Sequence, residues 1–546
     1  MSQTVFYDAT LQQIFEREGI VSLPLFSKEE LVYLQEIYQQ TLPPSHGLSF
    51  HSTMFIPDMD YRKKTDQVLR SILSGKINRL LKEYRLLFAN FITKEASPDT
   101  AVGIHQDWNF TSPEYLSLNI WIPLVDIDKK TGLFYALKGS HHVFSNLRYT
   151  PYETDAYAEL ENYIRKNATP FRVRAGEALI YHGAMVHFSD PNISGQPRIA
   201  VGCALIPQSA PNLHYYRRPQ DKKIEIFTVD ESFYHSFNFF ERPARAEKTG
   251  ELNACPGLPA LSELISNRMS SMRRIFRNDV LESEISRKGY VIIRNMVEEQ
   301  VCDDLYHFFD QHDTVDHRPF SITNWSNNAA YRSKTFQYIA EKLLPVSRQY
   351  LLNYRPVMGV FTAKRPSVKS DMLLHQDWSL VDESVFRSVS VWVALCDMNK
   401  RNGNLQVAEY SHLYAGLPRG MNIPVPFEDL RQEIQTHFLT DLPLAKGDAV
   451  VFDHRLIHAS PENQTERIRL AAVLALIPYE ADLIHYYKYV DNDHELEILK
   501  MDEGAFHLID FFDMPNKPRH IEVLKTIPAE FGSITKEDIL QYYSHV

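Results

Sequence analysis

The tetrapeptide His105-Gln106-Asp107-Trp108 recurs 270 residues later in the chain as His375-Gln376-Asp377-Trp378. Internal repeats define the architecture of a chain, so they are considered first. Three further pairs follow each tetrapeptide in the same order: Trp121 with Trp392, His187 with His458, and Arg198 with Arg469. So long a period indicates a duplicated domain, because solenoids repeat every few tens of residues.

The matching order extends from about residue 11 to 243, and from about residue 281 to 515. A chain of 546 residues is also longer than one hydrophobic core usually supports. We therefore predict a first domain over residues 1–245, a linker over 246–280 and a second domain with a C-terminal tail over 281–546. Within the linker we expect a short basic helix from Arg268 to Arg277.

Each repeat begins with helical signals and continues with short strands. Ser27-Lys28-Glu29-Glu30 is a capping box before the apolar-periodic run 31–38, and residues 65–84 are also predicted to be helical. Strands are predicted at 116–125, 171–181 and 198–206, and in the second repeat at 389–396, 449–453 and 469–477. This order predicts a mainly β protein with supporting helices, formed by two tandem double-stranded β-helix domains of the jelly-roll, cupin-like type.

Composition narrows the classes of function. The hydrophobic share of 44% and the charged share of 23% are typical of a soluble globular protein, and the net charge of −11 disfavours nucleic acid as a partner. The four cysteines form no C-x-x-C pair, so we expect reduced thiols. Neither a signal peptide nor an apolar stretch that could span a membrane is apparent, and we therefore expect a cytoplasmic protein.

Three residues in each repeat form a candidate metal site. His105 and Asp107 are two residues apart on a predicted strand, which would place both side chains on one face. His187 follows 82 residues after His105 and can supply a third ligand. One H-x-D triplet is a weak signal, but the second repeat keeps the whole set as His375, Asp377 and His458. Two histidines and one carboxylate with open positions are typical of non-haem iron(II) oxygenases.

An arginine in each repeat suits an organic anion. Arg198 and Arg469 each lie eleven residues after the distal histidine and begin an apolar strand. The residues on the face of Arg198 are small: Ala200, Gly202 and Ala204. A fixed guanidinium above a roomy lumen can hold a carboxylate with two hydrogen bonds, although by itself such an arginine is more often part of a surface ion pair.

Together these residues resemble the phytanoyl-CoA hydroxylase family of iron(II)/2-oxoglutarate oxygenases. The family pattern is H-Q-D, a strand with a central Trp, a G-S-H turn, and a distal His followed by Ser, Asn and Arg. The second repeat departs from it at the turn, where Tyr410 replaces the glycine. The resemblance implies that 2-oxoglutarate contacts Trp121, Ser189 and Arg198 in the first repeat, and Trp392, Ser460 and Arg469 in the second.

The resemblance also implies the reaction. We expect Fe(II) as the metal and 2-oxoglutarate and O2 as co-substrates, with succinate and CO2 released while an unactivated C–H bond is oxidised, most directly by hydroxylation. Asp107 and Asp377 favour this outcome over halogenation, because related halogenases have a small residue there. The expected substrate is a small metabolite, a lipid or a peptide, and the two domains would form an internal pseudo-dimer with two iron sites. Two alternatives remain: one catalytic domain beside a non-catalytic metal-binding domain, and a non-enzymatic cupin-like binding protein.

Overall fold

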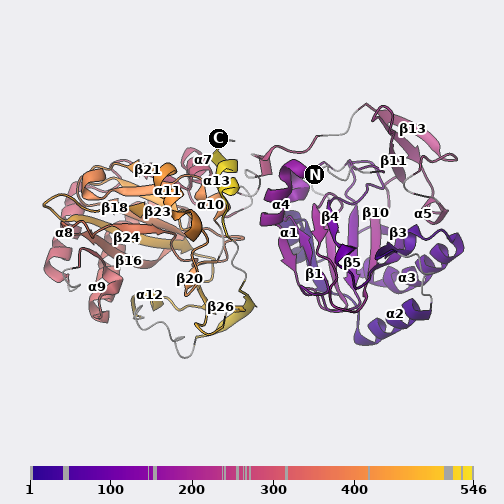
Figure 1. The fold of residues 1–546 in the computed structure, drawn as a ribbon, viewed down its shortest axis with the longest axis horizontal. Helices are drawn as coiled ribbons and strands as arrows, with labels where there is room; N and C mark the ends of the chain where they lie inside the picture. Colours follow the sequence, from indigo (N-terminus) through magenta and orange to yellow (C-terminus); the bar gives the residue numbers. More distant parts are fainter. Residues whose placement is uncertain are drawn as a thin grey trace. The chain divides into compact units, whose positions relative to one another are not determined.

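The computed structural model describes all residues except 1–3, 41–47, 146, 152–156, 237, 239–240, 254–256, 262, 265–266, 268, 270–271, 314–317, 416–417, 493, 509–520, 530–532 and 544–546. The chain divides into two compact units, residues 1–268 and 269–546, and both are drawn in Figure 1. Each unit contains two β-sheets that enclose a lumen, with helices packed on the outer face of the larger sheet.

The first unit contains a six-stranded sheet and a four-stranded sheet. The strands of the larger sheet are, in spatial order, β1 (Ile20–Pro24), β8 (Glu177–His182), β5 (Leu118–Pro123), β10 (Arg198–Pro207), β3 (Tyr84–Lys94) and β2 (Phe50–Ser52). Those of the smaller sheet are β4 (Val102–His105), β9 (His187–Ser189), β6 (Phe134–Ala136) and β7 (Thr169–Phe171). All neighbouring strands in both sheets run antiparallel.

Helices α1 (Ala9–Glu18), α2 (Lys28–Gln40) and α3 (Met59–Leu80) contribute to the core on the outer face of the larger sheet, with α3 against β3 (Figure 1). The predicted capping box before α2 is present, since the backbone N–H of Ser27 donates to the Glu30 carboxylate at 2.8 Å and that of Glu30 to Ser27 Oγ at 3.2 Å. Helix α3 begins six residues before the predicted start because Asp58 caps it, and its predicted last residue, Tyr84, instead begins β3.

Successive side chains along a strand of the larger sheet point alternately to the helix-covered outer core and to the lumen. Ile120 of β5 lies in the cluster that the helices share, whereas Trp121 packs with Phe134 of the smaller sheet. The predicted strand 171–181 is two strands, because Gly176 adopts the left-handed conformation (φ +84°) and turns the chain between β7 and β8.

The second unit repeats this architecture. Its six-stranded sheet contains β14 (Tyr290–Ile293), β22 (Ala449–Asp453), β18 (Val389–Ala394), β24 (Arg469–Pro478), β16 (Tyr354–Lys364) and β15 (Phe320–Ile322). Its four-stranded sheet contains β17 (Met372–His375), β23 (His458–Ser460), β19 (Leu405–Ala408) and β21 (Leu439–Leu442). The supporting helices are α7 (Asp279–Lys288), α8 (Glu299–His312) and α9 (Ala329–Tyr350). The predicted mainly β, tandem jelly-roll fold is therefore confirmed.

Short elements connect these sheets. In the first unit they are η1 (Thr53–Phe55), η2 (Pro98–Thr100), η3 (Ser140–His142), η4 (Ala158–Leu160), α4 (Glu161–Asn167) and α5 (Phe233–Ser236). In the second they are η5 (Thr323–Trp325), η6 (Lys400–Asn402), α10 (Ser411–Tyr414), η7 (Glu428–Leu430), α11 (Arg431–His437) and α12 (Ala505–Leu508).

A small additional sheet extends each unit. In the first it consists of β11 (Leu213–Arg217), β12 (Ile224–Thr228) and β13 (Glu247–Leu252). In the second it consists of β20 (Gly420–Met421), β25 (Ile484–Tyr487), β26 (Glu495–Lys500) and β27 (Val523–Pro528), and α13 (Lys536–Tyr543) follows. The C-terminal tail is thus part of the second unit.

Two details of the predicted linker differ from the structure. Residues 247–252 pair with β12 as strand β13, so the first unit continues beyond residue 245. The basic helix predicted from Arg268 to Arg277 does not extend to its predicted end: Met269 is helical and residues 272–277 are not, while Arg268, Ser270 and Ser271 lie outside the described residues. Phe276 instead forms a β-bridge with Leu351, which ties this segment into the second unit.

Two expectations from composition can be compared with the structure. Cys203, Cys302 and Cys396 are free thiols, and Cys255 lies outside the described residues. None of the helices within the described ranges combines the length and the apolar character needed to cross a bilayer.

Candidate metal and co-substrate site

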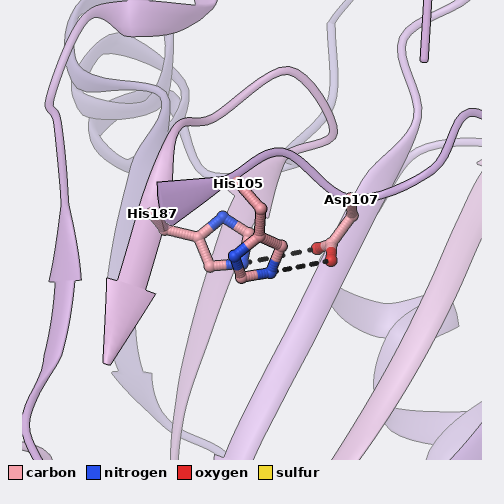
Figure 2. A group of neighbouring side chains, drawn as sticks. All are labelled: His105, Asp107 and His187. Carbon is pink, nitrogen blue, oxygen red and sulfur yellow. Dashed lines mark ion pairs between the residues drawn. The ribbon is translucent and has the colours of Figure 1, made fainter. Parts of the chain in front are cut away.

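The structure brings His105, Asp107 and His187 together at one edge of the smaller sheet (Figure 2). His105 ends β4 and His187 begins β9, and the register pairs these two residues directly. Nε2 of each imidazole lies 3.8 Å from one carboxylate oxygen of Asp107. One ligand atom from each residue lies within 4.8 Å of the others, a spacing that one metal ion can bridge.

Hydrogen bonds to the backbone fix the orientation of both imidazoles. His105 Nδ1 lies 2.8 Å from the carbonyl oxygen of Gly103, and His187 Nδ1 lies 3.0 Å from that of Met185. A carbonyl only accepts, so Nδ1 carries the proton in each ring. This tautomer leaves the lone pair of each Nε2 directed toward the space beside Asp107, as a metal ligand requires.

The spacing predicts that Asp107 lies on the same strand as His105, but the structure places it elsewhere. Strand β4 ends at His105, and Asp107 belongs to the loop that follows. The intervening Gln106 anchors this loop, because its amide donates to the carbonyl of Ala184 at 2.6 Å and accepts from Tyr157 Oη at 2.9 Å. The loop, rather than the alternation of a strand, turns the carboxylate toward the two imidazoles.

The second unit reproduces this cluster with His375, Asp377 and His458. The imidazole centroids are 4.1 Å apart in both units, with interplanar angles of 52° here and 50° in the first unit. The Nδ1 atoms again bond to backbone carbonyls, at 2.8 Å for His375 and 2.9 Å for His458. Both imidazoles of the second unit therefore carry the proton on Nδ1, as in the first unit.

Electrostatics favour the forms that bind a metal. Burial and the neighbouring His105 lower the pKa of His187 to about 4, and burial and His458 do the same for His375. Burial by itself would raise the pKa of Asp377. The nearby histidines lower this pKa by more than burial raises it, so it falls below the ordinary value. Neutral imidazoles beside an ionised carboxylate are the forms that metal coordination requires.

A cavity of about 260 Å³ joins the metal cluster to the predicted anion site in the first unit. Its walls contain all six residues singled out in the first repeat: His105, Asp107, Trp121, His187, Ser189 and Arg198. Arg198 lies 5.2 Å from the ring centroid of Trp121, Trp121 stacks on Phe134 at 5.6 Å, and Phe134 stacks on His187 at 5.2 Å. These stacked rings connect the arginine to the metal cluster along one wall.

Arg198 is 3% exposed, and only part of its guanidinium is hydrogen-bonded to the protein. Its Nη1 donates to the carbonyl of Gly132 at 2.9 Å, whereas its buried Nε has no hydrogen-bond acceptor among the described residues. In the second unit Arg469 lies 5.4 Å from Trp392 and donates through Nε to Gly403 at 3.0 Å. Neither arginine belongs to an ion pair within the described ranges, so the surface-pair alternative does not apply.

A buried lysine, not among the residues predicted from the sequence, lies beside each arginine. Lys94 at the end of β3 pairs in register with Arg198, and Lys364 pairs with Arg469. Both lysines are 0% exposed. Burial and the adjacent arginine lower the pKa of each lysine to about 6. The signal was available, since both lysines follow a phenylalanine by three residues, in Phe91-Ile-Thr-Lys94 and Phe361-Thr-Ala-Lys364.

Different residues hold the carboxylates of the two clusters. In the first unit Tyr181 Oη donates to Asp107 Oδ2 at 3.1 Å. In the second, Phe452 replaces the tyrosine in register, and Ser390 Oγ donates to Asp377 Oδ2 at 3.0 Å while contacting His454 Nε2 at 3.0 Å. These contacts could not be found from the spacing of the motif.

One arginine in each unit, also missed in the sequence, fixes the backbone of the aspartate. Arg148 Nε donates to the carbonyl of Asp107, and Arg419 Nε donates to that of Asp377 at 2.7 Å. The turn serine of the G-S-H pattern has a similar role, because Ser140 and Ser411 accept the N–H of the residue before the distal histidine, at 3.0 and 2.7 Å. The motif is therefore partly a set of supports for the metal cluster.

Comparison with known proteins identifies the family. The chain is 30% identical over 135 residues to phytanoyl-CoA dioxygenase 1 of Oryza sativa subsp. japonica, which is 23% of this chain and 45% of that protein. It is 28% identical over 138 residues to phytanoyl-CoA dioxygenase domain-containing protein 1 of Danio rerio, which is 23% of this chain and 47% of that protein. The chain thus spans less than half the length of these relatives.

Solved structures were compared as well. The carbocyclase SnoK from nogalamycin biosynthesis covers 39% of this chain and 88% of its own, at 20% identity and a TM-score of 0.30. HygX from Streptomyces hygroscopicus, solved with nickel and 2-oxoglutarate, covers 40% and 92%, at 16% identity and a TM-score of 0.30. The sequence model of the phytanoyl-CoA dioxygenase family matches residues 39–200 and 285–471, well over half of the chain. The chain therefore belongs to the phytanoyl-CoA dioxygenase family of oxygenases, as two copies in tandem.

Proposed function

We propose that this protein is an iron(II)- and 2-oxoglutarate-dependent dioxygenase that oxidises an unactivated C–H bond, most directly by hydroxylation. The proposed substrate is a small metabolite, a lipid or a peptide, and each domain carries one iron site. One observation carries the proposal: two imidazoles, a carboxylate and a buried arginine whose Nε has no acceptor among the described residues line a single cavity of about 260 Å³.

The donor set fits ferrous iron. Two imidazole nitrogens and one carboxylate oxygen lie within 4.8 Å of one another, and a ferrous ion held by three protein ligands keeps positions for other ligands. The proposed iron ligands are His105, Asp107 and His187 in the first domain, and His375, Asp377 and His458 in the second. Thiolates, which would favour zinc, are missing from both clusters.

The anion site fits the distal carboxylate of 2-oxoglutarate. Arg198 presents a buried Nε without an acceptor, a feature that native proteins seldom leave unexplained. Trp121 and Ser189 line the same cavity, and we propose that these two residues contact 2-oxoglutarate with Arg198. Trp392, Ser460 and Arg469 are the counterparts in the second domain. When bound, iron and 2-oxoglutarate supply the oxidising equivalent from O2, with succinate and CO2 as products.

The residues of the chain bind, orient and exclude water. Arg148 and Tyr181 fix the backbone and the side chain of Asp107, so the carboxylate is oriented before the metal binds. Aromatic rings make up much of the remaining wall, among them Phe55, Phe88 and Trp108. Such a wall favours a substrate with apolar surface.

The experiment is reconstitution of the full chain with Fe(II) under anaerobic conditions, followed by 2-oxoglutarate and O2. We expect about two Fe(II) per chain and slow succinate release, which accelerates when a substrate is found by mass spectrometry as a product gaining one oxygen. If the iron-loaded chain releases no succinate with any compound of a broad metabolite, lipid and peptide library, the proposal fails and the cupin-like binding protein is favoured. One iron per chain favours a single catalytic domain.

A further inference from the structure

We propose that Lys94 is a positioning residue for the distal carboxylate of 2-oxoglutarate in the first domain, and that Lys364 has this role in the second. The inference rests on the proposed function and deepens it. Lys94 and Arg198 form a pair of cations at the end of the lumen away from the metal cluster, and the co-substrate supplies the missing anion.

The register places the two cations together. Lys94 lies directly opposite Arg198 in the β3–β10 pair, and Lys364 directly opposite Arg469 in the β16–β24 pair. Side chains of directly opposed residues project from the same face of a sheet, so both cations belong to the lumen side. Like charges in this relation are unfavourable, and both units retain them although neighbouring positions have diverged.

Neither the lysine nor the arginine of each unit forms an ion pair with a described residue. No carboxylate lies within ion-pair distance of Lys94, Lys364, Arg198 or Arg469 in the described parts of the chain. All four side chains are at most 3% exposed, so water screens them poorly. Burial, and after it the adjacent arginine, lowers the pKa of each lysine to about 6, although Asp190 in the first unit and Asp371 and Glu462 in the second act in the opposite direction. A bound carboxylate would remove the penalty and restore the ammonium form.

Lys94 also determines what Ser189 can do. Its Nζ lies 2.7 Å from Ser189 Oγ and 2.6 Å from the carbonyl oxygen of Asp190. In the ammonium form, which a bound carboxylate favours, Lys94 only donates, so Ser189 Oγ accepts from it and the hydroxyl proton is left to donate to another group. Ser189 lines the cavity, where the carboxylate held by Arg198 would be the acceptor. Lys364 instead donates to the carbonyls of Ser460 and Pro461, so only its charge acts in the second domain.

A purely structural role is the competing explanation, because Lys94 also ties β3 to the loop after β9. The two explanations differ for a ligand without a distal carboxylate. 2-Oxovalerate has the same oxo-acid end as 2-oxoglutarate and a methyl group in place of that carboxylate. A positioning role affects 2-oxoglutarate alone, whereas a structural role affects both acids.

The test is an anaerobic titration of the Fe(II)-loaded full chain, followed by the visible charge-transfer absorption of the iron–oxo-acid chelate. Asp377→Ala confines the signal to the first site, and Lys94→Met and Lys94→Gln are compared in that background. Glutamine keeps hydrogen-bond donors for Ser189 Oγ and the carbonyl of Asp190 but has no charge. Lys64→Met, at an exposed position of α3, is the matched control. Lys364→Met in an Asp107→Ala background examines the second site.

We expect both Lys94 variants to bind 2-oxoglutarate at least about tenfold more weakly, the loss typical of one charge-assisted hydrogen bond. Their affinity for 2-oxovalerate should stay within about twofold of the Asp377→Ala parent, which also verifies that the site is folded. An unchanged affinity for 2-oxoglutarate, or an equal loss for both acids, would overturn the inference. If the unaltered chain binds Fe(II) but shows no chelate with 2-oxoglutarate, the proposed function fails instead.

Discussion

The two units share the geometry of the candidate metal cluster but differ in the walls opposite it. The imidazole centroids are 4.1 Å apart in each unit, and an arginine stacks on a tryptophan at 5.2 and 5.4 Å. The larger sheet, by contrast, has changed at three positions that correspond in register: Gly202, Asn90 and Asn119 of the first unit are Val473, Val360 and Ser390 in the second. The stacked arginine and tryptophan are thus shared, while residues around them differ, including Ile92, whose counterpart Thr362 accepts from Arg469 Nη1 at 3.3 Å.

The exchange of glycine for valine changes the space in the lumen. A Cβ at Gly202 would meet Cδ1 of Ile92, the end of a flexible side chain, at 2.6 Å, so a side chain there requires Ile92 to shift. Val473 fills this position in the second unit and pairs in register with Val360. The second lumen is therefore more apolar and more filled beside Trp392.

The asparagines give the first lumen polar groups that the second lacks. The amide nitrogen of Asn119 lines the cavity side of β5, is buried, and has no partner among the described residues. Its counterpart Ser390 is already engaged with Asp377. Unpaired buried donors are costly, so we expect the substrate of the first domain to supply an acceptor. If only one domain turns over, these differences favour the first.

The largest effect should come from removing the metal-binding carboxylates one at a time. Asp107→Ala and Asp377→Ala should each lower the iron content from about two to about one per chain. Each should reduce 2-oxoglutarate turnover by its own domain more than about 100-fold, because loss of a ligand exceeds the 10- to 100-fold effect of its supporting contacts. Iron analysis and succinate release measure this. If both variants keep two irons, the ligand assignment is wrong.

The next effect concerns a buried ion pair that only the second unit contains. Asp453 and Arg455, each 2% exposed, make a two-pronged contact at 2.6 and 2.9 Å, whereas the first unit has His182 and Ala184 in their places. Arg455→Met should destabilise the second unit by about 3–5 kcal/mol, since it leaves a buried carboxylate unpaired. Denaturant unfolding gives the free energy, and Arg467→Met at an exposed position is the control.

The pH dependence of this pair has a definite sign. Burial would raise the pKa of Asp453, but the charge and hydrogen bonds of Arg455 lower it well below the ordinary carboxyl range. The contribution of the pair is therefore complete at neutral pH and is lost only as the pH falls through that lowered pKa. A difference below about 1 kcal/mol between Arg455→Met and the parent at neutral pH contradicts the account.

Exchanging the wall residues should change substrate use without removing iron. Gly202→Val should lower substrate-coupled oxidation by the first domain at least about fivefold, because overpacking of this kind costs about 1–3 kcal/mol. The iron content should be unchanged, because the histidine ligands belong to the smaller sheet. Product formation in an Asp377→Ala background is the measurement, and Val473→Gly is the reciprocal variant. Unaltered product formation would show that Gly202 does not face the substrate.

The smallest effect should come from the residues that hold the carboxylates. Tyr181→Phe makes the first unit like the second and should weaken Fe(II) binding there by about tenfold, and Ser390→Ala should do the same in the second. Competition with a metal chelator, in chains that retain one intact site, gives the affinity. Tyr84→Phe, which loses a hydrogen bond to a backbone carbonyl outside the cavity wall, should leave it unchanged.

Local patterns predicted much of the fold correctly. The strand predicted at 389–396 is β18 over Val389–Ala394, and the capping box at Ser27 begins α2. The boundaries that failed depend on single residues with a conformational role: Asp58 begins α3 earlier, and Gly176 divides one predicted strand into two. Asp58 and Gly176 are visible in the sequence, but many other polar residues and glycines could equally begin a helix or form a turn.

The duplication, the two sets of three metal-binding candidates and the two arginines could all be predicted from the sequence alone, because they are repeated at nearly constant offsets. Only the tertiary structure placed Asp107 in a loop, set Lys94 against Arg198, and supported one aspartate by Tyr181 and the other by Ser390. The physical reason is that alternation along a strand specifies which face a side chain occupies. The residue that it meets there depends on strand register, which packing across the whole domain decides.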